Sequence, residues 1–452
     1  MWANVRATCW GMITFLVKRQ SISYRRLSRE IERTQWLSAQ ELEAYQLTQL
    51  QRVVKHAYET VPYYTRLMNR LGLQPSSVQR LSDITAFPVM TKDDLRRIGP
   101  DIVSKKYPPW CLRTAYTGGT SGLPVPVRRD LWSIAREHAF VRRQFTWAGL
   151  TEADRCAYLE GRTVARPGET TARYHYYDAA MKELTLSTFH LSPATVRTYV
   201  DLMKEYAISA LVAYPSAACV LAKGCVDQGL TLPLRCVLTT SETLEESRKE
   251  FLTTAFACPV FDFYGSAERV CCIAMCEKGS YHVAPDYGLT ELHPAAAPNE
   301  GCYRLVSTGF WNMAMPLIRY QMGDLVRSSG RACACGRAFP VIDQIAGREE
   351  TIITTPSGVQ LGASAVEYVL ERILQSMYRL PVTAGRVVQD GPDQLTLEYV
   401  GAEGFQPVHA EQLREVMRQQ APQGMRTRIR AVQTMERTPR GKYLSFVMTE
   451  HH

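Results

Sequence analysis

The chain has 452 residues, of which 46% are hydrophobic and 21% are charged. This composition is ordinary for a globular protein and excludes a disordered, collagen-like or small disulfide-stapled chain. The length allows two or three domains. The net charge of +9 is spread along the chain without a long basic run, so we expect no nucleic acid partner.

The thirteen cysteines are odd in number and irregularly spaced, which is typical of reduced thiols in the cytoplasm. The sequence lacks a run of about 18 apolar residues, so we expect no transmembrane helix. A short apolar run from Cys9 to Val17 predicts an amphipathic helix that packs on the body of the protein. Peripheral membrane contact through residues 1–20 is the alternative.

Helical patterns dominate the N-terminal part. Ser38 and Glu41 have capping-box spacing, and apolar residues recur at helical period to about Thr60. The following Val61-Pro62 is expected to end this helix. Thr91 opens a second helix in the same way.

Short apolar runs alternate with helical patterns between Pro124 and Pro340. Such alternation predicts an α/β body with mostly parallel sheets. The clearest expected strands are Cys236–Leu238, Val260–Phe263 and Tyr303–Val306.

The pattern changes after Gly347, where short strands and two helices predict a small α+β domain. We therefore expect an N-terminal domain over residues 1–347 and a C-terminal domain over residues 348–452. The expected C-terminal elements are the strands Thr351–Thr354, Leu395–Val400 and Arg428–Val432 and the helices Ser364–Leu374 and Ala410–Gln420.

A Gly-rich segment is the most unusual local sequence. It reads Thr117-Gly118-Gly119-Thr120-Ser121-Gly122. Such a loop offers many backbone N–H donors to phosphate oxygens. The order of a Walker A loop is missing, and an ordinary polar turn is the alternative.

Two further segments place carboxylates in loops. The first reads Asp262-Phe263-Tyr264-Gly265-Ser266-Ala267-Glu268, and the second is Gly323-Asp324. A carboxylate can hold ribose hydroxyls or Mg²⁺, and an aromatic ring can stack on a base. Singly, each residue is more typical of a solvated acid or a core tyrosine, so their joint order carries the argument.

Together with Gly347-Arg348-Glu349-Glu350 and Gly441-Lys442, these motifs resemble the adenylate-forming enzyme superfamily. Within it, the chain resembles phenylacetate–CoA ligases and the CapK-like adenylating proteins of capsule biosynthesis. The segments His56–Tyr64, Phe87–Lys92 and Thr240–Leu244 are similar to patterns of that subfamily. The resemblance extends from about residue 40 to the end, and it implies a large body with a mobile C-terminal domain.

The resemblance implies three catalytic residues. Lys442 would stabilise the adenylation transition state, Glu268 would bind Mg²⁺, and Arg348 would lie near the ribose or phosphates of ATP. Asp324 would bind the ribose hydroxyls, and Glu349 would lie at the hinge. The other nucleotide contacts that the resemblance implies are Thr117, Gly118, Gly119, Thr120, Ser121, Gly122, Ser241, Glu242, Thr243, Asp262, Phe263, Tyr264, Gly265 and Ser266.

The implied activity is that of a ligase. ATP activates a carboxylic acid as an acyl adenylate, pyrophosphate leaves, and the acyl group passes to an acceptor, for which we expect the thiol of CoA. Amide or ester formation with an amine, an amino acid or a hydroxyl is the alternative. A catalytically silent scaffold protein is a third reading, and the retained Glu268, Asp324, Arg348 and Lys442 argue against it.

Two positions depart from the family pattern. Leu123 stands where the phosphate loop usually has Lys, so Lys442, Mg²⁺ and backbone donors must carry more of the phosphate charge. Glu349-Glu350 stands where the family usually has Asp-Asp, which keeps the charge and changes the side-chain length.

A possible metal site comprises Cys276, His282, Cys333 and Cys335. Three thiols and an imidazole suit a closed tetrahedral Zn²⁺ site. Cys271 and Cys272 are competing ligands, and inert buried thiols are the alternative. The resemblance to the subfamily implies a structural zinc at these four positions.

Overall fold

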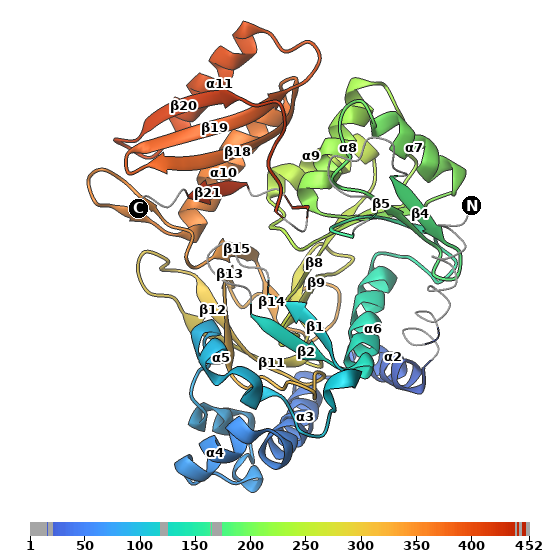
Figure 1. Cartoon of the computed structure of the whole chain (residues 1–452), viewed down its shortest axis with the longest axis vertical. Coiled ribbons are helices and arrows are strands. Elements are labelled where there is room, and N and C mark those ends of the chain that lie inside the picture. Colours follow the sequence, from blue (N-terminus) through green and yellow to red (C-terminus); the bar gives the residue numbers. More distant parts are fainter. Residues whose placement is uncertain are drawn as a thin grey trace.

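The computed structural model describes residues 16, 21–117, 125–162, 164, 174–438, 441–442 and 445–448 (Figure 1). We call residues 21–348 the body and residues 353–448 the C-terminal unit. The helix expected at Cys9–Val17, and the membrane contact considered for residues 1–20, fall almost entirely outside the described residues.

Four helices form the N-terminal part of the body. They are α2 (Ile22–Thr34), α3 (Ala39–Thr60), α4 (Pro62–Leu71) and α5 (Lys92–Ile98). The capping box of α3 is confirmed, because Ser38 N donates to Glu41 Oε2 at 2.8 Å. The predicted stop at Val61-Pro62 ends α3, but the chain goes directly into α4, with its proline at the first helical position.

A nine-stranded sheet forms the centre of the body. Its strand order is β14-β10-β9-β8-β7-β6-β3-β5-β4. The five strands from β8 to β5 run parallel, and the strands at both edges pair antiparallel. The bounds are β3 (Cys156–Leu159), β4 (His175–Asp178), β5 (Glu183–Leu186), β6 (Ala210–Ala213), β7 (Cys236–Thr240), β8 (Val260–Gly265), β9 (Cys272–Met275), β10 (Tyr281–Val283) and β14 (Val341–Ile342).

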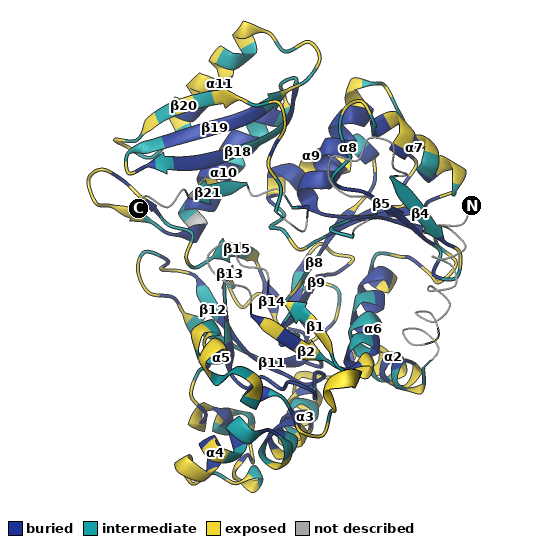
Figure 2. Cartoon of the chain, viewed as in Figure 1, coloured by how far each residue is buried: buried dark blue, intermediate teal, exposed yellow. Residues whose placement is uncertain are grey.

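Helices cover both faces of the parallel strands, of which β3, β5 and β6 are buried throughout (Figure 2). Alternate residues of a strand point to opposite faces. Leu211 and Val237 pack with α7 (Val196–Glu205), α8 (Pro215–Asp227) and α9 (Glu246–Phe256), whereas Val212 and Leu238 pack with the end of α6 (Leu131–Trp147). Burial on both faces explains the continuous apolar runs of these strands.

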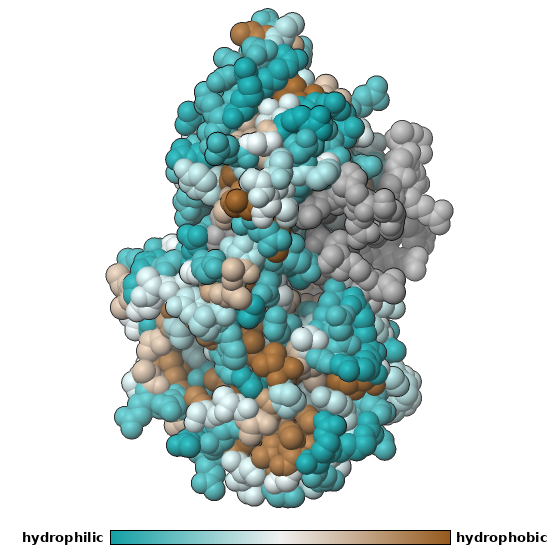
Figure 3. Space-filling model, turned by 90° about the vertical axis from the view of Figure 1, so that its left-hand side faces the viewer, coloured by the Kyte–Doolittle hydropathy of each residue, from teal (hydrophilic) through white to brown (hydrophobic). Residues whose placement is uncertain are grey.

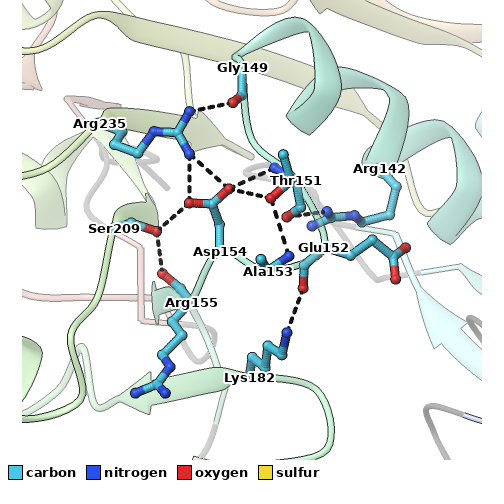
Figure 4. Close-up of polar contacts among 10 residues, drawn as sticks. All are labelled: Arg142, Gly149, Thr151, Glu152, Ala153, Asp154, Arg155, Lys182, Ser209 and Arg235. Atoms are coloured by element: carbon cyan, nitrogen blue, oxygen red, sulfur yellow. Dashed lines mark hydrogen bonds and ion pairs between the residues drawn. The ribbon is translucent and has the colours of Figure 1, made fainter.

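A polar network joins the amino ends of β3, β6 and β7 (Figure 4). Asp154 Oδ1 accepts hydrogen bonds from Ser209 Oγ at 2.9 Å and from Arg235 Nη1 at 2.7 Å. Its Oδ2 accepts from the backbone N–H of Thr151 at 2.7 Å. Partial burial opposes ionisation, but these hydrogen bonds lower the pKa of Asp154 to about 2. The network holds together the amino ends of these parallel strands, and the candidate site lies at the opposite, carboxyl ends.

A second sheet of the body is antiparallel throughout, with the order β11-β12-β13-β15. Its strands are β11 (Gly288–Pro294), β12 (Tyr303–Gly309), β13 (Tyr320–Arg327) and β15 (Gln344–Arg348), and a separate hairpin comprises β1 (Arg113–Tyr116) and β2 (Pro126–Arg129). The predicted α/β fold class is confirmed, and its parallel part is the centre of the large sheet.

The C-terminal unit has a hydrophobic core of its own. A four-stranded sheet with the order β20-β19-β18-β21 packs against helices α10 and α11 (Figure 1). The strands and helices expected here are all present, with ends shifted by a few residues. The bounds are β16 (Ile353–Thr354), β17 (Gln360–Leu361), α10 (Ala363–Tyr378), β18 (Val382–Gly391), β19 (Gln394–Gly401), α11 (Pro407–Gln420), β20 (Arg426–Ala431) and β21 (Phe446–Met448).

The surface is mostly hydrophilic on the face that carries the C-terminal unit, with scattered hydrophobic spots on the body (Figure 3). Among the described residues, every helix is too short or too polar to span a bilayer. The described cysteines are all free thiols.

Candidate active site

The candidate site lies at the carboxyl ends of β6, β7 and β8, the edge where open α/β sheets bind ligands. Tyr214 follows β6, Ser241 follows β7, and Glu268 follows β8. Lys442 of the C-terminal unit reaches this edge. Its Nζ donates to the backbone carbonyl of Ser241 at 2.6 Å and lies 5.5 Å from the centroid of the Tyr214 ring.

Two contacts dock the segment that carries Lys442 on the body. Gly441 has a φ of +77°, and a Cβ added there would lie 2.4 Å from Thr188 Oγ1. Only glycine combines this backbone conformation with so close an approach. Arg437 Nη2 donates to the carbonyl of Leu191 at 3.2 Å. The predicted catalytic lysine is therefore held against the body.

Glu242 anchors the loop that follows β7. Its carboxylate accepts hydrogen bonds from the backbone N–H of Ser216 at 3.0 Å and from Ser216 Oγ at 3.1 Å. Ser216 lies in the first turn of α8, where a negative charge is favourable. Burial raises the pKa of Glu242. Glu242 and its half-buried neighbour Thr243 thus belong to the loop that contacts Lys442 through Ser241, and nucleotide binding by this loop stays a prediction.

Asp324 and Arg348 face each other across β13 and β15. Arg348 Nε lies 2.8 Å from Asp324 Oδ1, and the hydroxyl of Tyr264 donates to Asp324 Oδ2 at 2.6 Å. The Asp324 carboxylate raises the pKa of Arg348. Three predicted nucleotide-binding residues from distant segments therefore form one cluster.

Glu268 is 8% exposed and accepts a hydrogen bond from the hydroxyl of Tyr320 at 3.2 Å. Tyr320 begins β13, the strand that also carries Asp324. The Phe87–Lys92 motif supports this strand, because Met90 N donates to Arg319 O and Gln321 N donates to Met90 O, both at 2.9 Å. This support explains why an N-terminal motif accompanies the site.

Asp262 is 2% exposed, and both of its carboxylate oxygens have partners within the sheet. Thr239 Oγ1 donates to Oδ1 at 2.6 Å, and the hydroxyl of Tyr281 donates to Oδ2 at 3.0 Å. Burial raises the pKa of Asp262 to about 6. These contacts serve the sheet, and nucleotide binding by Asp262 stays a prediction.

The next residues of this segment lie at the end of β8. A Cβ added to Gly265 would lie 3.0 Å from the Phe263 ring, so glycine allows this ring to fold back. Ser266 Oγ is buried and has no hydrogen-bond partner. Nucleotide binding by Gly265 and Ser266 stays a prediction.

The Gly-rich segment connects β1 to β2, and the structure describes its two ends, Thr117 and Val125. Thr117 N donates to Val125 O, and Val125 N donates to Thr117 Oγ1, both at 3.0 Å. These bonds close the base of the loop. The predicted phosphate contacts Gly118, Gly119, Thr120, Ser121 and Gly122 lie outside the described residues.

Glu349, the predicted hinge residue, follows β15. Arg304 Nε lies 2.6 Å from Glu349 Oε1, and Gln321 Nε2 donates to Oε2 at 3.3 Å. Its backbone N–H donates to Gly323 O at 2.9 Å. Glu349 is thus tied to the strand that carries Asp324, and its role as a hinge stays a prediction.

The Cys/His cluster assembles as the sequence predicts. The ligand atoms of Cys276, His282, Cys333 and Cys335 all lie within 4.8 Å of one another. Cys276 Sγ and Cys333 Sγ are 3.7 Å apart, and Cys335 Sγ lies 3.4 Å from His282 Nε2. Two thiolates on one tetrahedral Zn²⁺ would lie about 3.8 Å apart, so the donor set fits zinc.

The surroundings of the cluster also suit a metal. His282 Nδ1 lies 3.2 Å from the carbonyl of Phe339, an arrangement that leaves Nε2 as the ligand atom. Burial lowers the pKa of His282, which favours the neutral imidazole that metals bind. The competing cysteines, Cys271 and Cys272, are outside this group.

A cavity of about 750 Å³ lies between the body and the C-terminal unit. Its walls include Arg327 and Gln344 of the body and Thr355, Leu361 and Tyr368 of the C-terminal unit. None of the predicted nucleotide-binding residues lines it. The cavity is therefore distinct from the cluster around Lys442.

Comparison with curated proteins finds relatives of moderate similarity. Protein CapK of Staphylococcus aureus is 22% identical over 58% of this chain and 58% of its own length. Phenylacetate-coenzyme A ligase of Thermus thermophilus is 26% identical over 74% of this chain and 76% of its own length, and that of Escherichia coli is 24% identical over 73% and 76%. No family model matches the chain.

Solved structures share the fold. The 2-hydroxyisobutyryl-CoA ligase in the postadenylation state, in complex with R3-HIB-AMP, aligns with a TM-score of 0.70 and 20% identity over 92% of both chains. The same ligase in the thioesterification state, in complex with 2-HIB-AMP and CoA, aligns with a TM-score of 0.57 and 21% identity over 92% of both chains. The suspected resemblance is confirmed in sequence and in fold, and the agreement is better with the postadenylation arrangement.

Proposed function

We propose that this protein is an AMP-forming acid ligase, which activates a carboxylic acid with ATP and transfers the acyl group to CoA. The observation that carries the proposal is the position of Lys442. Its ammonium group lies against Ser241, at the edge of the sheet that also presents Glu268. The names of the relatives and of the aligned ligases support the same activity.

In the first half-reaction, the carboxylate of the acid attacks the α-phosphorus of ATP and pyrophosphate leaves. A carboxylate is already nucleophilic, so the protein need supply no base. Lys442 would place a positive charge where negative charge develops in the transition state, and such preorganised charge is worth several kcal/mol.

The remaining site residues would bind and orient ATP. Asp324 would accept hydrogen bonds from the ribose hydroxyls, and Arg348 would lie beside it. The Gly-rich loop that begins at Thr117 would hold the β- and γ-phosphates. Glu268 would hold Mg²⁺, which supplies positive charge to the phosphates when bound.

The second half-reaction requires a movement of the C-terminal unit. Lys442 lies at the site that the acceptor must approach, so the unit must withdraw it before a thiol attacks the acyl adenylate. We favour CoA as the acceptor because the phenylacetate-coenzyme A ligases cover three quarters of the chain. An amine or a hydroxyl would give an amide or an ester instead.

We further propose that Cys276, His282, Cys333 and Cys335 hold one structural Zn²⁺. Four protein ligands leave no open position on a tetrahedral metal, so it would not act in catalysis. The site joins the β9–β10 connection to the segment before β14. Zinc would thus fix the antiparallel edge of the large sheet.

The free thiols support a reducing compartment, the cytoplasm.

A panel of carboxylic acids tests the proposed function. Purified protein is incubated with ATP and Mg²⁺, and AMP and pyrophosphate are measured with and without CoA. The proposal expects acid-dependent release of both, with a CoA thioester as the product when CoA is present. Amide or ester products with amine or alcohol acceptors would identify the alternative reaction, and the absence of AMP with every acid would favour a scaffold role.

A further inference from the structure

We propose that Arg248 is a positioning residue, which holds the C-terminal unit in the arrangement that presents Lys442 to the site. This inference rests on the proposed function. It adds a set of contacts that hold the C-terminal unit in place for adenylation and must break before the acceptor step. Arg248 lies on α9 of the body, and none of the sequence motifs includes it.

Arg248 pairs with a carboxylate of the body and joins the two parts of the chain through two hydrogen bonds to the C-terminal unit. Its Nε lies 3.1 Å from Glu245 Oε2 within the body. The same nitrogen donates to the hydroxyl of Tyr378 at 3.1 Å, and Nη2 donates to Ser445 Oγ at 2.7 Å. Tyr378 is the last residue of α10, and Ser445 lies three positions after Lys442. The guanidinium therefore hydrogen-bonds to the segment that carries Lys442.

Ser445 also links Arg248 to its ion-pair partner Glu245. Ser445 Oγ donates to Glu245 Oε1 at 3.2 Å, so one hydroxyl bonds to both members of the Arg248–Glu245 pair. The side chains of Arg248 and Glu245 are only 4% and 2% exposed. A buried ion pair is costly unless further hydrogen bonds satisfy its donors and acceptors. Tyr378 and Ser445 supply such bonds only while the C-terminal unit is docked.

Two contacts beside Arg248 hold α9 of the body against α10 of the C-terminal unit. The rings of Phe251 and Tyr378 are stacked, with their centroids 4.9 Å apart and their planes 3° from parallel. The backbone N–H of Ser247 donates to Glu371 Oε1 at 2.6 Å. The first half of α9 thus contacts the second half of α10, and rotation of the unit must break all of these contacts together.

The two half-reactions should therefore respond differently to this network. Adenylation needs the docked arrangement, because only this arrangement brings Lys442 to Ser241. The acceptor step needs the unit to leave. Weakening the contacts on the side of the C-terminal unit should slow adenylation and spare the acceptor step.

The test uses the double variant Tyr378→Phe/Ser445→Ala, which leaves the buried Arg248–Glu245 pair intact. The matched control is Tyr399→Phe/Ser376→Ala, which makes the same chemical changes elsewhere in the C-terminal unit. Tyr399 lies in the core of the unit, and Ser376 Oγ donates to Arg372 O of its own helix. Acyl adenylate formation is measured with ATP and an accepted acid. Thioester formation is measured with CoA and the chemically prepared adenylate of that acid.

We expect the double variant to lose at least about tenfold in adenylation, since the loss of even one hydrogen bond to a charged group shifts an equilibrium by roughly that factor. The acceptor step should change by less than about twofold, and the control should match the wild type in both steps. Equal losses in both steps, or a double variant that behaves as the control does, would overturn the proposal.

Hydrogen exchange separates this inference from the proposed function, because it needs no substrate. In the double variant, we expect faster exchange in peptides that contain Ser247 and residues 441–442, with unchanged exchange in α11. Unchanged exchange around Ser247 would overturn the docking role, whatever the enzymatic activity. A wild-type protein that forms no adenylate with any acid would refute the proposed function. The exchange measurement would still test the docking role of Arg248, because it needs no substrate.

Discussion

At the scale of single residues, Lys442 is the side chain on which the account depends most. We expect Lys442→Ala to lower the rate of adenylation by about 100-fold or more, because one positioned cation at a developing charge is worth about 3 kcal/mol. Thioester formation from a supplied acyl adenylate should fall much less. The measurement is pyrophosphate release compared with thioester formation.

Lys249, a lysine of the body, serves as the control for that variant. Lys249 forms an ion pair with Glu246 on α9, within one helix, and Lys249→Ala should leave both steps unchanged. If Lys442→Ala reduced the two steps equally, the role of Lys442 in the transition state would have to be abandoned.

Asp324 provides the second test at this scale. Asp324→Asn keeps the size of the side chain and removes the charge that Arg348 and the ribose hydroxyls would share. Since a hydrogen bond to a charged group is worth about 1.5–3 kcal/mol, ATP should bind at least about tenfold more weakly. Isothermal titration calorimetry measures this affinity, and an unchanged value in a folded variant would contradict the assignment.

The sequence marks the candidate site residues more clearly than it marks the residues that they contact. Glu268, Asp324, Arg348 and Lys442 stand in motifs that are legible without a structure. Tyr320 and Arg248 do not, because their role arises only when distant elements meet. No local pattern marks such a residue.

At the scale of elements, the metal cluster joins segments that are far apart in the sequence. If zinc occupies it, purified protein should contain about one Zn²⁺ per chain. Cys335→Ser should lose the metal and lower the melting temperature together, because binding energy at such a site contributes to folding. Elemental analysis and thermal unfolding measure the two effects.

Cys225→Ser is the control for the metal site, since Cys225 is a buried thiol of α8 outside the cluster. This variant should keep its zinc. A folded and active wild-type protein without stoichiometric metal would leave the four residues as ordinary thiols and a histidine.

The network at the amino ends of β3, β6 and β7 predicts a pH dependence. The pKa of Asp154 is lowered from 3.8 to about 2 in the folded protein, so its ionised form stabilises the fold above pH 4. We expect Asp154→Asn to cost about 2 kcal/mol at pH 7, and the difference from wild type to shrink as the pH falls from 4 toward 2.

Urea unfolding at several pH values measures that difference. Asp93→Asn is the control, because the carboxylate of Asp93 is 85% exposed and its ion pair with Arg96 is worth little. A constant difference between wild type and Asp154→Asn down to pH 2.5 would contradict the assigned cause.

Elements with strong local signals were predictable. The capping box at Ser38 and the helical period of the apolar residues after it predicted the bounds of α3 closely. The apolar runs predicted the positions of β7, β8 and β12. The antiparallel edges of the large sheet were not predictable in this way. Pairing direction depends on connections such as β8–β9–β10, which the period of the side chains does not encode.

At the scale of the whole molecule, the position of the C-terminal unit sets what the site can do. The unit is docked through Lys442, Gly441 and the Arg248 network, which suits the adenylation step of the proposed reaction. The better alignment with the postadenylation structure agrees with this arrangement. The sequence predicted two parts and a hinge, but their relative position depends on side-chain contacts that only the folded chain reveals.

The most direct test of the central claim follows an oxygen atom through the reaction. An accepted acid labelled with ¹⁸O in its carboxylate is incubated with the protein, ATP, Mg²⁺ and CoA, and the products are analysed by mass spectrometry. Attack of the carboxylate on the α-phosphorus, followed by transfer of the acyl group, places one ¹⁸O atom in AMP. The account predicts labelled AMP and unlabelled pyrophosphate, whereas ADP with labelled inorganic phosphate, or AMP without the label, would contradict it.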